Sequence, residues 1–277
     1  MLLYKHAESS RWVTNDPRCS WTNHSGSSAC DVIEKSPFNE IYFIGDSLIR
    51  NMFATFLMLM SDDPVHGAWS KQTKPEWKKI CKSDTFYFWD ECRKLVGDMD
   101  NVFFPSNLCG GRKPNFTASF KMFYSLGQTD MFHNFMKSLE GKSNTLVLIG
   151  VGAHMAFDPD IVINKYLEPA LQRWKTYNAN KPSEATWPKI FFVFPMRGSL
   201  LKPPAYFKFQ DNRKLNKFVS RLTDYCSALR IPLFDFRQLG DLVYSFDGTH
   251  YGRGVNLMKN QIFLNFLSSF HEYEKRH

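Results

Sequence analysis

Short apolar runs alternate with longer helical stretches along most of this chain, and the alternation limits the folds open to it. The clearest buried-strand candidates are IYFIG at 41–45, TLVLIGVG at 145–152, KIFFVFPM at 189–196 and PLFDF at 232–236. Helical spacing is found over 48–60, 128–139, 160–178, 210–230 and 253–271. Strands separated by helices of about 12 residues or more pair in parallel and are covered by helices on both faces. The sequence therefore predicts a three-layer α/β/α sandwich with a mainly parallel central sheet.

The rest of the chain is expected to elaborate one domain that spans residues 1–277. Residues 1–37 are polar and rich in turn-forming residues, and they predict an irregular N-terminal arm. Residues 61–118 hold three of the six cysteines and the strand-like pieces FYFW and NVFF, and they predict a loop-rich insertion. A further strand is expected within 119–126. A chain of this length buries enough surface to fold as a single large core.

Composition excludes several classes of protein. The chain has 35 Lys and Arg against 27 Asp and Glu, a formal net charge of +8. The basic residues are spread out, without the long stripe or module of a nucleic-acid-binding protein, so an anionic glycan is the acidic partner that the charge still allows. No apolar run reaches the 18 residues of a membrane span. Cys and His do not cluster with metal-ligand spacing, and no dinucleotide fingerprint is complete, so we predict no metal and no cofactor.

The cysteines and two glycosylation sequons bear on the compartment. The six cysteines contain no CxxC pair and allow up to three disulfides, in 15 possible connectivities. The sequons begin at Asn23 and Asn115. The opening residues lack the apolar core of a signal peptide. We expect a secreted protein, or the part of a longer chain that lies in the Golgi or ER lumen; the alternative is a cytoplasmic protein with free cysteines.

Two motifs contain residue types that are used in catalysis, and each motif lies next to a helix. Gly45-Asp46-Ser47 ends the 41–45 run, which places Ser47 at a helix start, where free N–H groups favour negative charge. A helix cap is the simpler interpretation of this serine. Asp247-Gly248-Thr249-His250 precedes the last helix, and a turn at its glycine directs the carboxylate and the histidine toward one cleft. Such a pair is typical of a general base and the group that orients it.

A third motif, Gly150-Val151-Gly152-Ala153-His154, follows the strongest strand candidate. Sites in parallel α/β sheets form at the carboxyl ends of the strands. We interpret the motif as a flexible turn whose backbone amides and histidine face the same site as the other two motifs. A purely structural role for the histidine is the alternative.

In chain order these motifs resemble the pattern of SGNH/GDSL-type esterases. More narrowly, Gly45-Asp46-Ser47-Leu48-Ile49-Arg50-Asn51 is similar to the GDSxxR block of the PC-esterase group, and Gly152-Ala153-His154-Met155 resembles the G-x-H-F segment of its NXPE branch. The group also includes trichome-birefringence-like polysaccharide O-acetyltransferases and the luminal domain of sialate O-acetyltransferase. The resemblance spans residues 38–270 and implies an SGNH-hydrolase-like fold with flavodoxin-like topology.

The resemblance implies a catalytic triad in which Ser47 is the nucleophile, His250 the base and Asp247 the group that orients the base. It also implies that the Ser47 N–H is one oxyanion donor. Arg50 matches the Arg of the GDSxxR block and is expected to support the site or to contact the acyl-enzyme; a surface helix arginine is the alternative.

Two departures from the family pattern concern the oxyanion hole. The block that usually reads GxND reads Gly150-Val151-Gly152-Ala153 here, so its Asn donor is missing, and we expect Gly152 and His154 to take over this support. The second oxyanion glycine is not evident, and Gly110 or Gly111 is the candidate. Loss of one oxyanion donor typically costs about 10²–10³ in kcat.

The implied activity is acyl transfer on O-acyl groups of a carbohydrate, O-acetyl above all, by an esterase or by an O-acetyltransferase with a separate acyl donor. Aromatic residues make up 16% of the chain. We predict that Trp69, Trp77 and Trp89 of the insertion bind the glycan, with core filling as the alternative. The alternative function, favoured by the missing Asn, is a non-catalytic glycan-binding or protein-interaction domain on the same scaffold.

Overall fold

A single parallel sheet organises the computed structural model, which describes residues 21–102, 108–199, 201–241 and 243–270. The strands are β1 (Glu40–Gly45), β2 (Thr117–Lys121), β3 (Thr145–Gly150), β4 (Lys189–Val193) and β5 (Leu233–Phe234). Their order is β2-β1-β3-β4-β5, and every neighbouring pair is parallel. This is the flavodoxin-like order, in which the winding of the chain reverses between β1 and β3.

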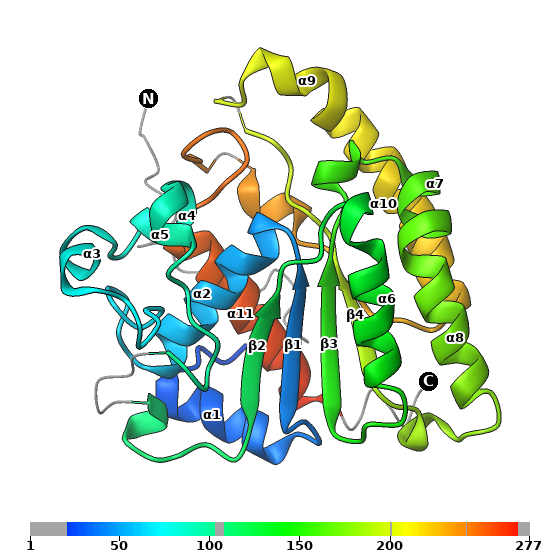
Figure 1. The fold of residues 1–277 in the computed structure, drawn as a ribbon, viewed down its shortest axis with the longest axis horizontal. Helices are drawn as coiled ribbons and strands as arrows, with labels where there is room; N and C mark the ends of the chain where they lie inside the picture. The colour runs from blue at the N-terminus through cyan, green and yellow to red at the C-terminus, as the bar shows by residue number, and fades with distance from the viewer. Residues whose placement is uncertain (1–20, 103–107, 200, 242, 271–277) are drawn as a thin grey trace.

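Helices cover both faces of the sheet, which confirms the predicted α/β/α sandwich (Figure 1). One face carries α1 (Gly26–Lys35), α2 (Ser47–Met60) and α11 (Arg253–Ser268); the other carries α6 (Thr129–Ser138), α8 (Glu168–Asn178) and α10 (Asn212–Ala228). Alternate side chains of β3 enter the two cores, since Leu146 and Leu148 join the first and Val147 and Ile149 the second. All six residues of β3 are buried, as a strand covered on both sides requires.

Shorter elements connect these layers. The short helices are α3 (Pro75–Ile80), α4 (Thr85–Phe88), α5 (Asp90–Arg93), α7 (Pro159–Ile161) and α9 (Pro204–Gln210). A π-helical turn, η4 (Val162–Leu167), joins α7 to α8. The 3₁₀ turns are η1 (Leu108–Gly110), η2 (Leu126–Gln128), η3 (Ala153–Met155), η5 (Ser183–Ala185) and η6 (Arg237–Gly240). Of these elements, α3, α4, α5 and η1 lie within the insertion at 61–118, which is therefore built of short helical turns joined by loops.

Two segments form helices where the sequence analysis predicted other structure. The N-terminal arm was expected to be irregular, yet α1 occupies part of it, because Ala29, Cys30 and Ile33 form a buried helical stripe. The FYFW piece of the insertion was expected to be strand-like and instead begins within α4. Its buried residues, Phe86 and Tyr87, are adjacent in sequence, whereas a strand would alternate buried and exposed positions. Residues 103–104 of the NVFF piece and residues 1–20 of the arm lie outside the described residues.

Two disulfides tie the insertion together. Cys30–Cys109 joins α1 to η1, and Cys81–Cys92 links the end of α3 to α5. Cys226 is a buried free thiol on α10, so it takes no part in the third disulfide that six cysteines allowed, and Cys19 lies outside the described residues. Two disulfides are consistent with a secreted or luminal protein.

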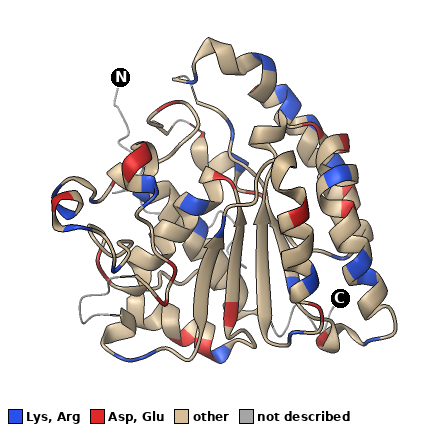
Figure 2. Cartoon of the chain, viewed as in Figure 1, with Lys and Arg blue, Asp and Glu red and all other residues tan. Residues whose placement is uncertain are grey.

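The structure also bears on charge and on membranes. Lys and Arg are interspersed with Asp and Glu over the helices and loops, without a continuous band of one sign in this view (Figure 2). Within the part of the chain that the structure describes, no helix has both the length and the apolar character needed to span a bilayer.

Candidate active site

The first and third motifs meet where β1 and β3 end. Gly45 pairs with Gly150, and a Cβ on Gly45 would lie 1.9 Å from the Gly150 carbonyl oxygen. The close approach of the two strands therefore requires glycine at position 45. Asp46 then caps α2, because its carboxylate accepts the N–H of Leu48 at 2.9 Å. The capping role thus belongs to Asp46, and Ser47 becomes the first residue of the helix, with its N–H bonded to no described group.

Ser47 is joined to the second motif by a chain of hydrogen bonds. Its Oγ lies 2.7 Å from Nε2 of His250, and Nδ1 of His250 lies 2.6 Å from Oδ2 of Asp247. Because Nδ1 carries the proton that the carboxylate accepts, Nε2 is left as the acceptor for the Ser47 hydroxyl. The sequence separation between Ser47 and His250 is 203 residues, and the fold brings them into contact.

The Asp247 carboxylate accepts hydrogen bonds from the backbone of its own loop as well as from the imidazole of His250. Its Oδ1 accepts the backbone N–H groups of Thr249 and His250, at 2.9 and 2.8 Å. Burial raises the pKa of Asp247, but the hydrogen bond and charge of His250, together with these two N–H groups, outweigh burial and hold the pKa well below its usual range. Asp247 is therefore ionised at neutral pH and can stabilise an imidazolium.

A segment that follows β4 packs against the loop that contains Asp247 and His250. Gly248 has φ +80°, and a Cβ there would lie 1.9 Å from the backbone nitrogen of Lys202. The carbonyl of Gly248 accepts the N–H of Ser199 at 2.9 Å. The turn before His250 therefore needs glycine both for its backbone conformation and for space.

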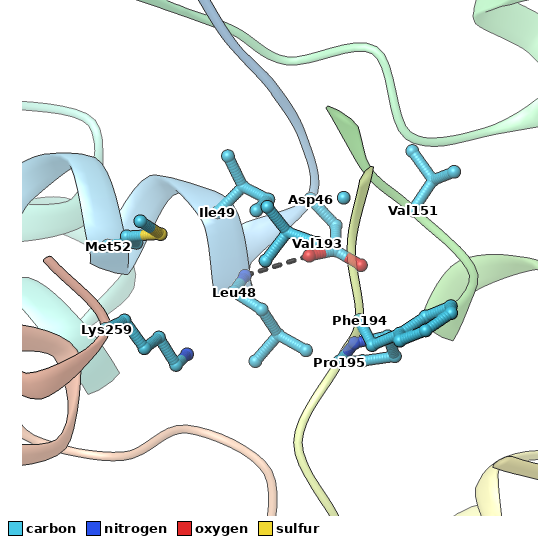
Figure 3. Close-up of a pocket in the computed structure, with 10 residues that line it drawn as sticks. Asp46, Leu48, Ile49, Met52, Val151, Val193, Phe194, Pro195 and Lys259 are labelled. Atoms are coloured by element: carbon cyan, nitrogen blue, oxygen red, sulfur yellow. Dashed lines mark hydrogen bonds between the residues drawn. The ribbon is translucent and has the colours of Figure 1, made fainter. Parts of the chain in front are cut away.

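Near the start of α2, a small cavity separates Asp46 from Lys259 of α11 (Figure 3). Its volume is about 10 Å³, which leaves room for about one water molecule. Burial raises the pKa of Asp46, against the Leu48 N–H and nearby positive charges. Burial lowers the pKa of Lys259 to about 8, against the charge of Asp46. The only hydrogen bond of the Lys259 ammonium to a described group goes to Oδ1 of Asn256, at 3.1 Å.

The buried Lys259 predicts a stability that rises with pH. Its pKa is about 8 in the folded protein against 10.5 for an ordinary lysine, so the folding penalty is complete below pH 8 and is relieved as the pH rises toward 10.5. We expect the free energy of unfolding to gain about 2 kcal/mol from this group between about pH 7 and about pH 9.5. Lys259→Met should remove that gain in urea titrations at both pH values. Lys217→Met, at an exposed position on α10, is the control, and an unchanged pH dependence in Lys259→Met would contradict the prediction.

Residues of the insertion complete the surroundings of the triad, and sequence reasoning missed them. Nη2 of Arg93 lies 3.4 Å from Nδ1 of His250, and the ring of Phe88 lies 4.5 Å from that of Phe246. Helices α4 and α5 have four residues each, too few to show a periodic signal. The pairing of Cys81 with Cys92, which anchors α5, is the one signal that pointed there, and it was one of many possible pairings.

The three tryptophans predicted to bind substrate have different positions. The prediction is wrong for Trp69, which is 7% exposed, belongs to the core and donates its ring N–H to the Cys81 carbonyl. Trp77 is half-buried on α3, and no described contact joins it to the triad. Trp89 is 43% exposed and lies between Phe88 and α5, in the segment that borders the triad. A glycan contact stays a prediction for Trp77 and Trp89.

Gly152 and His154, which were predicted to support the oxyanion, have different surroundings. Gly152 follows β3 with φ +138°, and its N–H donates to no other described group. His154 is exposed and its ring lies 4.4 Å from that of Tyr124; no hydrogen bond joins it to the described residues of the triad, although its charge lowers the pKa of Asp46. Their roles as donors stay predictions.

The prediction that Gly110 or Gly111 is the second oxyanion glycine is wrong. Gly110 packs beside Ser27 of α1, and Gly111 follows it in the same turn. Helix α1 lies at the end of the sheet opposite the carboxyl ends of the strands (Figure 1). The Cys30–Cys109 disulfide fixes this turn at that end, so neither glycine reaches Ser47.

No known protein-family model and no curated protein matches this chain. Among residues 21–102, 108–199, 201–241 and 243–270, no group of three or more His, Cys, Asp or Glu side chains is arranged to hold a metal ion.

Proposed function

We propose that this protein is a serine-dependent acyl-transfer enzyme that acts on O-acyl groups, most simply O-acetyl groups, of a carbohydrate. The observation that carries the proposal is the hydrogen-bonded chain from Ser47 Oγ through His250 to Asp247, with distances of 2.7 and 2.6 Å. A helix cap would need none of this, and Asp46 already caps α2. The resemblance of the GDSxxR and DGTH motifs to PC-esterases supports the same assignment.

The first half of the reaction forms an acyl-enzyme. His250 Nε2 takes the hydroxyl proton as Ser47 Oγ attacks the ester carbonyl carbon. The tetrahedral intermediate collapses when the C–O bond to the alcohol breaks, and the alcohol leaves with the proton returned from His250. Asp247 holds the imidazole in the required tautomer and stabilises its positive charge meanwhile.

The second half determines the reaction class. His250 removes a proton from water or from a sugar hydroxyl, whose oxygen attacks the acyl carbonyl and releases Ser47 with its proton restored. Water as the acceptor makes the protein an esterase, and a sugar hydroxyl makes it an O-acetyltransferase. Both outcomes use the same three residues.

The developing oxyanion needs donors at the carboxyl edge of the sheet. The N–H groups of Ser47 and Gly152 donate to no described group, and both residues lie next to the ends of paired strands, β1 and β3. Two backbone donors can stabilise the intermediate without the Asn of the GxND block. We assign them this role as part of the proposal.

A fluorophosphonate ester, which phosphonylates activated serines as fluoride leaves, tests the proposal directly. We expect one label per protein on the tryptic peptide that contains Ser47, and protection by an O-acetylated polysaccharide that the protein deacetylates. Release of acetate in water, or an increase in acetyl mass on a glycan in the presence of an acetyl donor, then separates esterase from transferase. A native protein that the reagent leaves unlabelled at Ser47 would contradict the proposal.

The missing Asn favours a second candidate, a glycan-binding domain that has kept the scaffold without turnover. The two candidates separate in one experiment. The binding domain would retain a glycan on an affinity column equally well in wild type and Ser47→Ala, without fluorophosphonate labelling and without acetate release.

A further inference from the structure

Arg50 is a buried cation without an anionic partner. Its side chain lies on α2, one turn after Ser47, and the residue is 9% exposed. One terminal nitrogen donates to Oδ1 of Asn51 at 3.2 Å, and Nε has no hydrogen-bond partner. Among the described residues, no carboxylate lies within ion-pair distance of its guanidinium. Buried charges are normally paired, because removing an ion from water is costly.

A second guanidinium, that of Arg93, adds its positive charge to the surroundings of Arg50. Burial lowers the pKa of Arg50 to about 10, and the positive charge of Arg93 adds to this effect. Arg93 lies in turn 3.4 Å from His250 Nδ1. Arg93 of α5 thus adjoins the proposed base, its positive charge also acts on Arg50 of α2, and His250 becomes a third cation during each proton transfer.

The nearby carboxylates are already engaged. Asp90 pairs with Nη1 of Arg93 at 2.7 Å, from a side chain that is 80% exposed. Asp247 is bonded to His250, and Asp46 accepts the N–H of Leu48. The charges of Asp46 and Asp90 raise the pKa of Arg50 from a distance, but neither aspartate forms an ion pair with it. An anion from outside the chain is what this arrangement lacks.

We propose that Arg50 and Arg93 form an anion subsite that binds a carboxylate or sulfate on the sugar whose ester reacts at Ser47. The Arg50 guanidinium offers the planar donors that such oxyanions prefer. Arg93, whose Nε and Nη2 donate to the Tyr87 carbonyl and whose Nη1 pairs with Asp90, adds its positive charge beside His250. The location beside His250 places the charged group on the same sugar residue as the reacting ester, or on its neighbour. The inference rests on the proposed acyl transfer and defines its substrate class: acidic rather than neutral glycans.

Matched probes test the subsite. Mono-O-acetylated methyl galacturonoside and methyl galactoside differ only in a carboxylate that replaces a hydroxymethyl group, and the acetylated galactoside 6-sulfate forms a third arm. We expect wild-type kcat/KM to be about tenfold or more higher for the charged probes than for the neutral one, because charge-assisted bidentate hydrogen bonds are the stronger kind. The arm with the larger preference identifies the oxyanion that the subsite takes.

Substitutions assign the preference to its residues. Arg93→Met and Arg50→Met should bring the ratio of charged to neutral kcat/KM toward one, whereas Arg93→Lys should retain part of it. Arg173→Met, half-exposed on α8, is the matched control and should keep the wild-type ratio. If Arg50→Met fails to fold, the more exposed Arg93 still decides the question.

A binding experiment separates this inference from the proposed function. With Ser47→Ala, calorimetry should show that methyl galacturonoside binds more tightly than methyl galactoside, and that Arg93→Met in the same background removes the difference. Equal affinities and equal wild-type kcat/KM values would overturn the subsite, even where Ser47-dependent hydrolysis of an aryl acetate is intact. Absence of that hydrolysis with a retained carboxylate preference would instead overturn the enzyme proposal alone.

Discussion

Hydrolysis of an aryl acetate is expected to fall on the order of 10³- to 10⁶-fold when Ser47 is replaced by alanine. The substitution removes the only atom in the triad that can form the acyl-enzyme, while the oxyanion donors and the His250–Asp247 pair stay in place. The residual rate should then be that of water attack aided by the remaining site. Initial rates at saturating aryl acetate, for wild type and variant in parallel, measure the effect.

The rest of the triad provides an internal check on this result. In Ser47→Ala, a second change of His250 to alanine should add little further loss, because residues that act as one unit are not additive. Ser138→Ala, on α6 and away from the triad, is the matched serine control and should keep the wild-type rate. Wild-type activity in Ser47→Ala with an unaltered melting temperature would rule out Ser47 as the nucleophile.

Removal of the Cys30–Cys109 disulfide should give the largest loss of stability. The bond closes a loop with a sequence separation of 79 residues, and the chain-entropy relation assigns such a loop about 4.5 kcal/mol. The bridge joins α1 to η1, so its loss frees the insertion from the layer that contains α2. Guanidinium unfolding of the Cys30→Ala/Cys109→Ala double variant measures the difference.

The second disulfide provides the comparison. Cys81 and Cys92 are separated by 11 residues, and the same relation gives about 3 kcal/mol for Cys81→Ala/Cys92→Ala. We expect the longer loop to cost more, and losses in the reverse order would show that the native contacts of each bridge outweigh loop closure. Cys226→Ala removes a free thiol and is the control for substitution at a cysteine.

The layered fold follows from the sequence because its signals are local. The run 146–150 is apolar and all of 145–150 is buried, as in a strand covered on both faces. The motifs that carry the proposed chemistry are placed by the same rule, since they follow strands that end at one edge of the sheet. Ser47 and His250 therefore meet even though 203 residues separate them.

The parts that escaped sequence analysis depend on contacts between distant segments. Arg93 lies beside His250 on α5, which the Cys81–Cys92 disulfide anchors. Neither this disulfide nor the Arg93–His250 contact produces a periodic pattern in the sequence. Trp69 and Gly110 are similar cases, since a ring or a glycine has the same local pattern whether it lies in the core or beside a site. The tertiary neighbours alone distinguish the two.

The contact between α2 and α11 has a consequence for when the proposed activity first becomes possible. Asn260 of α11 donates to the carbonyl of Met52 at 2.9 Å, so the helix that follows His250 packs directly on the helix that begins at Ser47. During synthesis Ser47, the proposed nucleophile, emerges about 200 residues before His250, its proposed base. Under the proposed mechanism, a chain that still lacks His250 has no base for Ser47, so ester cleavage requires that α11 has packed on α2.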